Sequence, residues 1–120
     1  MALTEGTHAG EFLISEAPGT LSRERVTIKS GQNLTAGTVL WKITADGKYK
    51  AVDNAASDGS QTATGILYEA VDASAADKDG TMIARLAEVT AAEIVWPSSE
   101  DPSDQAADTL DLAALFIVLR

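Results

Sequence analysis

The chain has 120 residues, of which 45% are apolar and 5% aromatic, and it contains no cysteine. This length suits one domain with an aliphatic core, and the composition excludes intrinsic disorder, disulfides and thiolate metal ligands. No apolar run approaches the ~20 residues that span a bilayer. The first residues lack the basic and apolar segments of a signal peptide, so we expect none.

The net charge of −9 is distributed unevenly along the chain. Residues 1–50 hold six basic and five acidic residues, whereas residues 51–120 hold three basic and thirteen acidic ones. The acidic part would repel phosphate, so we expect no binding of nucleic acid there. Such a charge is typical of a soluble surface. Alternatively, the acidic residues 51–120 form a surface that faces solvent, while residues 1–50 contact a partner.

The N-terminal 20 residues carry no hydrophobic periodicity and one short apolar cluster, Phe12-Leu13-Ile14, which ends before Pro18-Gly19. Three apolar residues do not define a core. The segment is therefore either a frayed terminus or an extended peptide that adds to the edge of a partner's sheet through main-chain hydrogen bonds.

The middle of the chain predicts short strands separated by glycine turns. Apolar and polar residues alternate over residues 25–29, which is typical of a half-buried strand. A second run over residues 39–43 precedes Asp46-Gly47, a strong signal for a two-residue hairpin turn. Gly65 lies inside a further apolar run, which indicates a bulge or the close approach of another backbone.

The last third predicts two more strands, a helix and a closing strand. Residues 81–89 and 91–96 are the strand candidates. Asp101 is a good helix N-cap, and Pro102 suits the first helical position. The helical spacing predicts an apolar face of Ala106, Leu110, Ala113 and Ala114. Because no strand–helix–strand alternation appears, we expect a mainly β fold of about six strands without a parallel sheet.

No constellation of catalytic or metal-ligating residues stands out. His8 is the only histidine, and it lies in the least regular part of the chain. Without cysteine, a zinc site would need three carboxylates or waters, which is unusual. Asp72, Asp77 and Asp79 share a loop but lack the ligand spacing of a calcium loop. No glycine motif that cradles phosphate occurs. We therefore expect no metal, no cofactor and no catalysis.

Two other residue types have binding interpretations. Trp41 and Trp96 are the residue type of a sugar-stacking platform, but each lies in an apolar run, which favours packing in the core or between subunits. Lys48 follows the predicted hairpin turn, where swinging-arm carrier domains hold their modified lysine. Its neighbours Gly47 and Tyr49 do not match the acidic or methionine neighbours of such lysines.

The ordered series of elements resembles the head decoration proteins of tailed bacteriophages, the family of the phage lambda capsid-stabilising protein. The resemblance starts at about Gly10 and covers nearly the whole chain. Its stretches are residues 10–43, 47–73, 82–89, 94–100 and 104–120. No single motif in these stretches is specific to the family, but the order in which they follow one another is.

The resemblance implies a compact, β-clip-like domain of small α+β type, at residues 25–120, after a flexible capsid-binding arm at residues 1–24. It implies homotrimers at three-fold and quasi-three-fold positions on the outer surface of the expanded phage head, which they hold against DNA pressure. The protein would be made in the host cytoplasm and end on the virion. The implied partners are other copies and the major capsid protein, with no nucleic acid, membrane or small-molecule substrate.

Combining the residues with the resemblance gives two candidate sites. The capsid-binding segment is predicted at Glu11, Phe12, Leu13, Ile14 and Ser15. The trimer interface is predicted at Trp96, Pro97, Leu115 and Phe116. Two other classes remain open from the sequence. One is a carbohydrate-binding or lysine-modified carrier module, and the other is a small hydrolase that uses paired carboxylates, of which no pair stands out.

Overall fold

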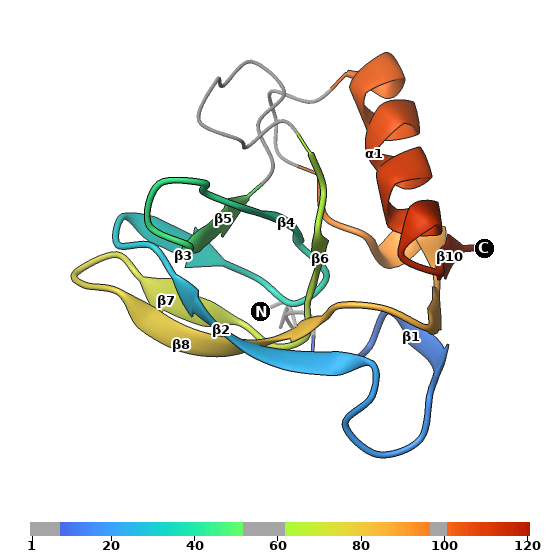
Figure 1. Cartoon of the computed structure of the whole chain (residues 1–120), viewed down its shortest axis with the longest axis horizontal. Helices are drawn as coiled ribbons and strands as arrows, with labels where there is room; N and C mark the ends of the chain where they lie inside the picture. Colours follow the sequence, from blue (N-terminus) through green and yellow to red (C-terminus); the bar gives the residue numbers. More distant parts are fainter. Residues whose placement is uncertain (1–7, 52–61, 97–100) are drawn as a thin grey trace, which may run out of the picture.

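The computed structural model describes residues 8–51, 62–96 and 101–120 (Figure 1). Within these residues the chain forms ten strands, one α-helix and one short 3-10 helix. The strands are β1 (Leu13–Glu16), β2 (Arg23–Ile28), β3 (Gln32–Leu34), β4 (Val39–Lys42), β5 (Tyr49–Ala51), β6 (Gly65–Leu67), β7 (Val71–Ala73), β8 (Lys78–Ile83), β9 (Ala87–Val89) and β10 (Ile117–Leu119). The helices are η1 (Ala91–Glu93) and α1 (Pro102–Ala114). The predicted mainly β fold with one C-terminal helix is confirmed.

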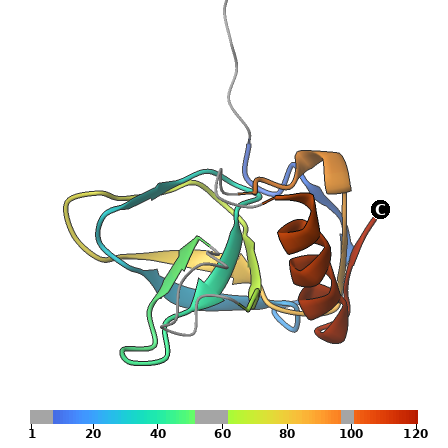
Figure 2. The same ribbon diagram turned by 90° about the horizontal axis from the view of Figure 1, so that it is seen from above.

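Five of the strands close a barrel in the order β2-β5-β4-β6-β8. Its longest antiparallel pair joins β2 to β8, with Arg23 opposite Ile83 and Ile28 opposite Lys78. β3 and β7 form a separate two-stranded sheet, and β1, β9 and β10 form a three-stranded one. Figures 1 and 2 show the barrel on one side of the molecule and α1 with the β1-β9-β10 sheet on the other.

Two clusters of buried side chains hold these parts together. One cluster includes Val26, Ile28 and Leu40 among the barrel strands. The other joins Trp41 of the barrel to Leu112 of α1. β4 supplies residues to both clusters, with Leu40 in one and Trp41 in the other, so both of its faces are buried. This explains why its sequence is continuously apolar rather than alternating.

The glycine predictions are confirmed in part. A Cβ atom on Gly65 would lie 2.6 Å from the carbonyl oxygen of Ile83, so β6 and β8 approach as closely as predicted. The hairpin between β4 and β5 also forms, with Lys42 opposite Tyr49. Its turn is longer than the predicted two residues, because the Gly47 N–H bonds to the Ile43 carbonyl at 2.9 Å and closes a wider loop.

Several predicted elements differ in the structure. The strand expected at residues 81–89 is interrupted between β8 and β9, where Leu86 has a left-handed φ of 55°. Residues 91–93 form η1 instead of a strand, and Val95 makes an isolated bridge to Thr38. β9 and β10 run parallel, with α1 on the connection between them, so the expectation of no parallel sheet is wrong for this pair.

The C-terminal helix begins as predicted. The Asp101 side chain accepts hydrogen bonds from the backbone N–H groups of Ser103 and Asp104, and Pro102 occupies the first turn. Its predicted apolar face is wrong, because Leu110 is 72% exposed whereas Leu112 is fully buried. Leu112 is four residues after the buried Asp108, so both lie on the same face of α1. This is the face that packs against the core cluster.

Candidate functional site

The three-stranded sheet has one face in the core and one face outside. Leu13, Val89 and Ile117 pack into the core cluster shared with α1. Residues alternate between the faces of a sheet, so Glu88 on β9 and Val118 on β10, which are register partners, both leave on the other side. We call this side the outer sheet face, and its described members are Ile14, Ser15, Leu86, Glu88, Phe116, Val118 and Arg120.

A polar network crosses the outer sheet face. The Ser15 hydroxyl donates to the Glu88 carboxylate at 2.8 Å, and Arg120 forms an ion pair with the same carboxylate. These contacts lower the pKa of Glu88, chiefly through the bond from Ser15 and then through Arg120. The network therefore links β1, β9 and β10 while leaving the apolar members of the face in solvent.

Four apolar side chains surround this network, and two of them have unusual backbones. Ile14, Leu86, Phe116 and Val118 are 52%, 37%, 68% and 42% exposed. Leu86 and Phe116 lie beside each other at the start of the parallel β9–β10 pair and have φ values of 55° and 62°. Bulky residues rarely adopt this left-handed conformation, and such outliers are often part of a functional surface.

Phe116 lies two residues after the end of α1, at the position where helices commonly place glycine. Its N–H bonds to the Ala113 carbonyl at 2.9 Å, which completes the helix end. Glycine is favoured there because it accepts a positive φ without steric cost. This chain has a phenylalanine instead, and its ring is exposed. Burial of the ring within its own subunit therefore does not compensate for the left-handed backbone.

The predicted capsid-binding segment is divided by the structure. Phe12 is fully buried in the core cluster, and Leu13 packs against that cluster. Glu11, Ile14 and Ser15 are exposed. The expectation of a loose arm through residue 24 is therefore wrong for Phe12 to Glu16. β1 pairs with β9 across a bulge at Ile14, which supplies the backbone and hydrophobic partners that the short cluster lacks in sequence.

An ion pair fixes the end of β1 to the start of β2. The Arg23 Nε–H makes a bifurcated hydrogen bond to the two carboxylate oxygens of Glu16, at 3.0 and 3.1 Å, and the buried Ser22 hydroxyl donates to the same carboxylate. Arg23 lowers the pKa of Glu16 and outweighs the raising effect of partial burial. The Arg23 guanidinium also stacks 4.1 Å from the centre of the Tyr68 ring, against which Gly10 is packed.

The predicted trimer residues differ in their availability. Trp96 and Leu115 are half-buried and pack against the core cluster of their own chain. Phe116 is exposed. Pro97 lies outside the described residues. Sequence reasoning missed Leu86, because its exposure depends on the left-handed turn that separates β8 from β9, and no glycine marks that turn.

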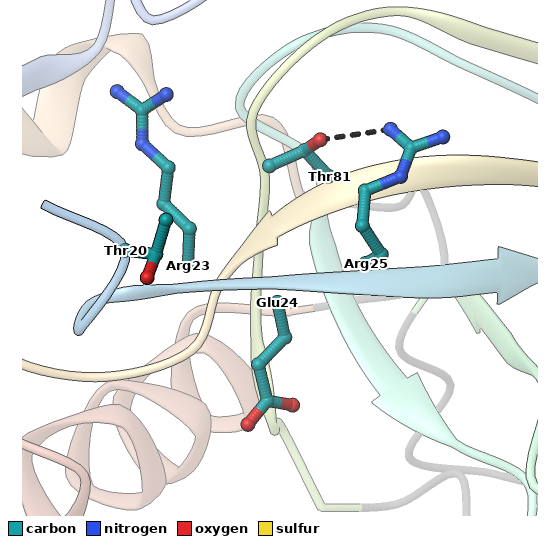
Figure 3. Close-up of a pocket in the computed structure, with 5 residues that line it drawn as sticks. All are labelled: Thr20, Arg23, Glu24, Arg25 and Thr81. Carbon is teal, nitrogen blue, oxygen red and sulfur yellow. Dashed lines mark hydrogen bonds between the residues drawn. The ribbon is translucent and has the colours of Figure 1, made fainter.

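An open pocket of about 310 Å³ lies over β2 and β8 (Figure 3). Its lining residues are Thr20, Arg23, Glu24, Arg25 and Thr81. In Figure 3 the side chains of Arg23 and Arg25 stand on the same side of β2, whereas Glu24 points to the other side. Arg25 donates to the Thr81 hydroxyl at 3.0 Å, and its nearest carboxylate, on Glu69, is 3.8 Å away.

Lysine and aspartate side chains near the β4–β5 turn are in structural contacts. Lys48, the carrier-domain candidate, forms a 2.5 Å ion pair with Asp77, which also accepts from the Ser30 N–H. In the described residues, no three histidines or acids come together as metal ligands. Nor does any helix there have the length and hydrophobicity to cross a membrane.

No curated protein matches the chain. The family model of the bacteriophage lambda head decoration protein D matches residues 2–117, which is nearly the whole length. The match agrees with the resemblance of the ordered strands and with a structure whose candidate site is a surface. The chain therefore belongs to the phage head decoration proteins, structural proteins of the outer capsid surface.

Proposed function

We propose that the chain binds as a homotrimer to the outer surface of the expanded phage head, at three-fold and quasi-three-fold positions, and stabilises it against DNA pressure. The observation that carries the proposal is the outer sheet face, where Ile14, Leu86 and Phe116 are exposed on a sheet rigidly fixed to the core. Exposed apolar side chains gathered on one face mark an interaction site. This task needs binding free energy and no catalytic group.

The shell contact is assigned to the β1 side of the outer sheet face. β1 pairs with β9 on one side and is an edge of its sheet, so its other edge offers main-chain groups to a strand of the major capsid protein. Glu11, Ile14 and Ser15 are exposed there. Residues 1–7 lie outside the described residues, and we propose that they extend the same contact.

The subunit contact is assigned to the other side of the face, around Phe116. A trimer brings three shell contacts together, and linked contacts gain about 10²–10⁴ in avidity when all can engage at once. Weak individual contacts by β1 are then sufficient for stable decoration. This is consistent with a β1 that is held in its own domain and pays no large ordering entropy on binding.

Shell binding tests the proposal directly. Expanded empty heads of the phage that encodes the chain are mixed with the wild type and with Ile14→Asp, and bound protein is measured after sedimentation. The matched control is Leu110→Asp, because Leu110 is more exposed than Ile14 and lies on α1. We expect wild-type and control decoration, with a loss of about tenfold or more in affinity for Ile14→Asp.

A truncation separates the N-terminal residues from β1. Deleting residues 2–7 leaves Phe12 in the core, so we expect a folded trimer with weaker shell binding. Deleting residues 1–15 would instead remove a buried aromatic residue and unfold the domain. Wild-type protein that never binds the expanded head would contradict the proposed function. Full binding by Ile14→Asp would contradict the assignment of β1.

A further inference from the structure

The backbone just before β1 is attached to a residue far along the chain. The Gly10 N–H bonds to the Tyr68 carbonyl at 2.9 Å, and the Gly10 carbonyl accepts from the Leu13 N–H at 3.0 Å. These bonds hold a turn between the Tyr68 backbone and β1. Residues 1–7, which lie outside the described residues, join the domain immediately ahead of this turn.

Position 10 requires glycine for two reasons. Its φ of 68° is left-handed, a conformation that glycine adopts without steric cost. A Cβ atom there would also lie 2.7 Å from Cε2 and 3.1 Å from Cζ of the Tyr68 ring. The absence of a side chain thus lets the Gly10 backbone lie directly against that ring. We call this the Gly10–Tyr68 contact.

The Tyr68 ring is held by its other neighbours, so it cannot easily move away from Gly10. The Arg23 guanidinium stacks 4.1 Å from the ring centre and is itself bound to Glu16, the last residue of β1. The ring also packs against the core cluster shared with α1, and the Tyr68 N–H bonds to the Thr81 carbonyl at 2.8 Å. The Gly10–Tyr68 contact is therefore made against a fixed partner.

The burial of β1 does not depend on this contact alone. Phe12 is fully buried in the core cluster, and β1 pairs with β9 from Leu13 onward. What the Gly10–Tyr68 contact adds is a fixed position for the backbone upstream of Phe12. Residues that are already ordered lose little conformational entropy on binding, so a fixed origin favours any contact that residues 1–7 make.

We propose that Tyr68 is a positioning residue for shell binding: by holding Gly10, it fixes the point from which residues 1–7 reach the capsid protein. The inference rests on the proposed shell contact of β1 and residues 1–7, and it names what directs that segment. A segment with a fixed origin samples a smaller volume, which raises its effective concentration at a neighbouring site on the shell. Loss of the ring weakens shell binding through residues 1–7, while β1 stays paired with β9.

Tyr68→Ala in two backgrounds tests this inference. Binding to expanded empty heads is measured by sedimentation for the full chain and for a chain that lacks residues 2–7. We expect Tyr68→Ala to weaken binding of the full chain about tenfold, because the turn at Gly10 must then be ordered on the shell. The shortened chain should show no further loss. Tyr68→Phe, which keeps the ring, should bind as the wild type does.

Gly10→Ala tests the same contact without removing a ring from the core. Its matched control is Gly19→Ala, because Gly19 has nearly the same φ of 69° but no described atom would lie within 4 Å of its Cβ. Both variants strain the backbone, and only Gly10→Ala collides with Tyr68. We expect about tenfold weaker shell binding for Gly10→Ala and wild-type binding for Gly19→Ala. Equal losses for the two variants would overturn the inference.

Amide hydrogen exchange in the free protein provides a readout that does not depend on shells. The Gly10 N–H should exchange about tenfold faster in Tyr68→Ala than in the wild type, since the turn opens locally. Tyr49→Ala is the matched control, because Tyr49 is also half-buried but packs against the other core cluster. It should leave both Gly10 exchange and shell binding unchanged. Circular dichroism checks that every variant is folded.

The outcomes separate this inference from the proposed function. An equal loss of binding by Tyr68→Ala in both backgrounds, or wild-type exchange of its Gly10 amide, would overturn the positioning role and leave shell binding standing. A shortened chain that binds as tightly as the full chain would do the same. Wild-type protein that does not bind the expanded head would overturn both.

Discussion

The two phenylalanines of this chain have opposite environments, although each lies directly before a strand of the same sheet. Phe12 precedes β1 and is fully buried, whereas Phe116 precedes β10 and is 68% exposed. Phe12, whose segment looked unstructured in the sequence, is part of the core, whereas Phe116, just after the end of a well-formed helix, stays exposed. We therefore propose that folding and assembly depend on different ends of one sheet.

The largest expected effect is on folding at the Phe12 end. Phe12→Ala should lower the free energy of unfolding by about 3–5 kcal/mol, because it leaves a cavity in the cluster that joins β1 to α1. Chemical denaturation at a fixed protein concentration measures the loss. The neighbouring Ile14→Ala serves as the control, since Ile14 is 52% exposed and should change stability by only about 0.5 kcal/mol. Equal losses for the two variants would contradict the burial of Phe12.

Local signals predicted the elements that depend on local chemistry. Asp101 and Pro102 marked the start of α1, and Gly65 marked a close strand contact, because capping and glycine geometry act within a few residues. The environment of Phe12 could not be predicted in this way. Its strand pairs with β9, and the Ser15–Glu88 bond joins residues 73 positions apart. Sequence periodicity gives no information on such a long-range pairing.

The same limit applies to the candidate site. Phe116 was among the predicted interface residues, since it belongs to the apolar end of the chain. Leu86 and the arginine pocket were not, because one depends on an unmarked left-handed turn and the other on the register of β2 against β8. Ile14 and Ser15 were among the predicted capsid-binding residues, and that role stays a prediction; the bulge beside them appears only in the folded sheet.

A smaller effect is expected at the start of α1, far from the Phe116 end of the same helix. Asp101→Ala removes the side chain that accepts from Ser103 and Asp104, and it should lower the free energy of unfolding by about 1 kcal/mol. Thermal or chemical unfolding gives the value. Trimer dissociation should not change, because the last turn stays packed through Leu112. A variant with normal folding stability but a weaker trimer would contradict the claim that this helix cap acts on folding and not on assembly.

The smallest effect concerns the ion pair that fixes β1, and it depends on pH. The pKa of Glu16 is lowered in the folded protein by Arg23, so its stabilising effect is present above the ordinary glutamate pKa of about 4.3. That effect is lost as the pH falls through the lowered value. Glu16→Gln should cost up to about 1 kcal/mol at pH 7.

The test of that pH dependence is the unfolding free energy of both proteins from pH 7 down to pH 3. The difference between wild type and Glu16→Gln should shrink as the pH falls, because protonated Glu16 no longer pairs with Arg23. A difference that stays constant or grows toward acid would show that the pair does not stabilise the β1–β2 connection.

The central claim is that Phe116 is kept at a glycine position for assembly and not for folding, and Phe116→Gly tests it most directly. Glycine relieves the left-handed backbone, which costs other residues about 1–2 kcal/mol, and little buried surface is lost. Chemical denaturation and sedimentation of the same sample should show a more stable fold, by about 1 kcal/mol, together with a weakened trimer. A less stable fold with an unchanged trimer would contradict the account.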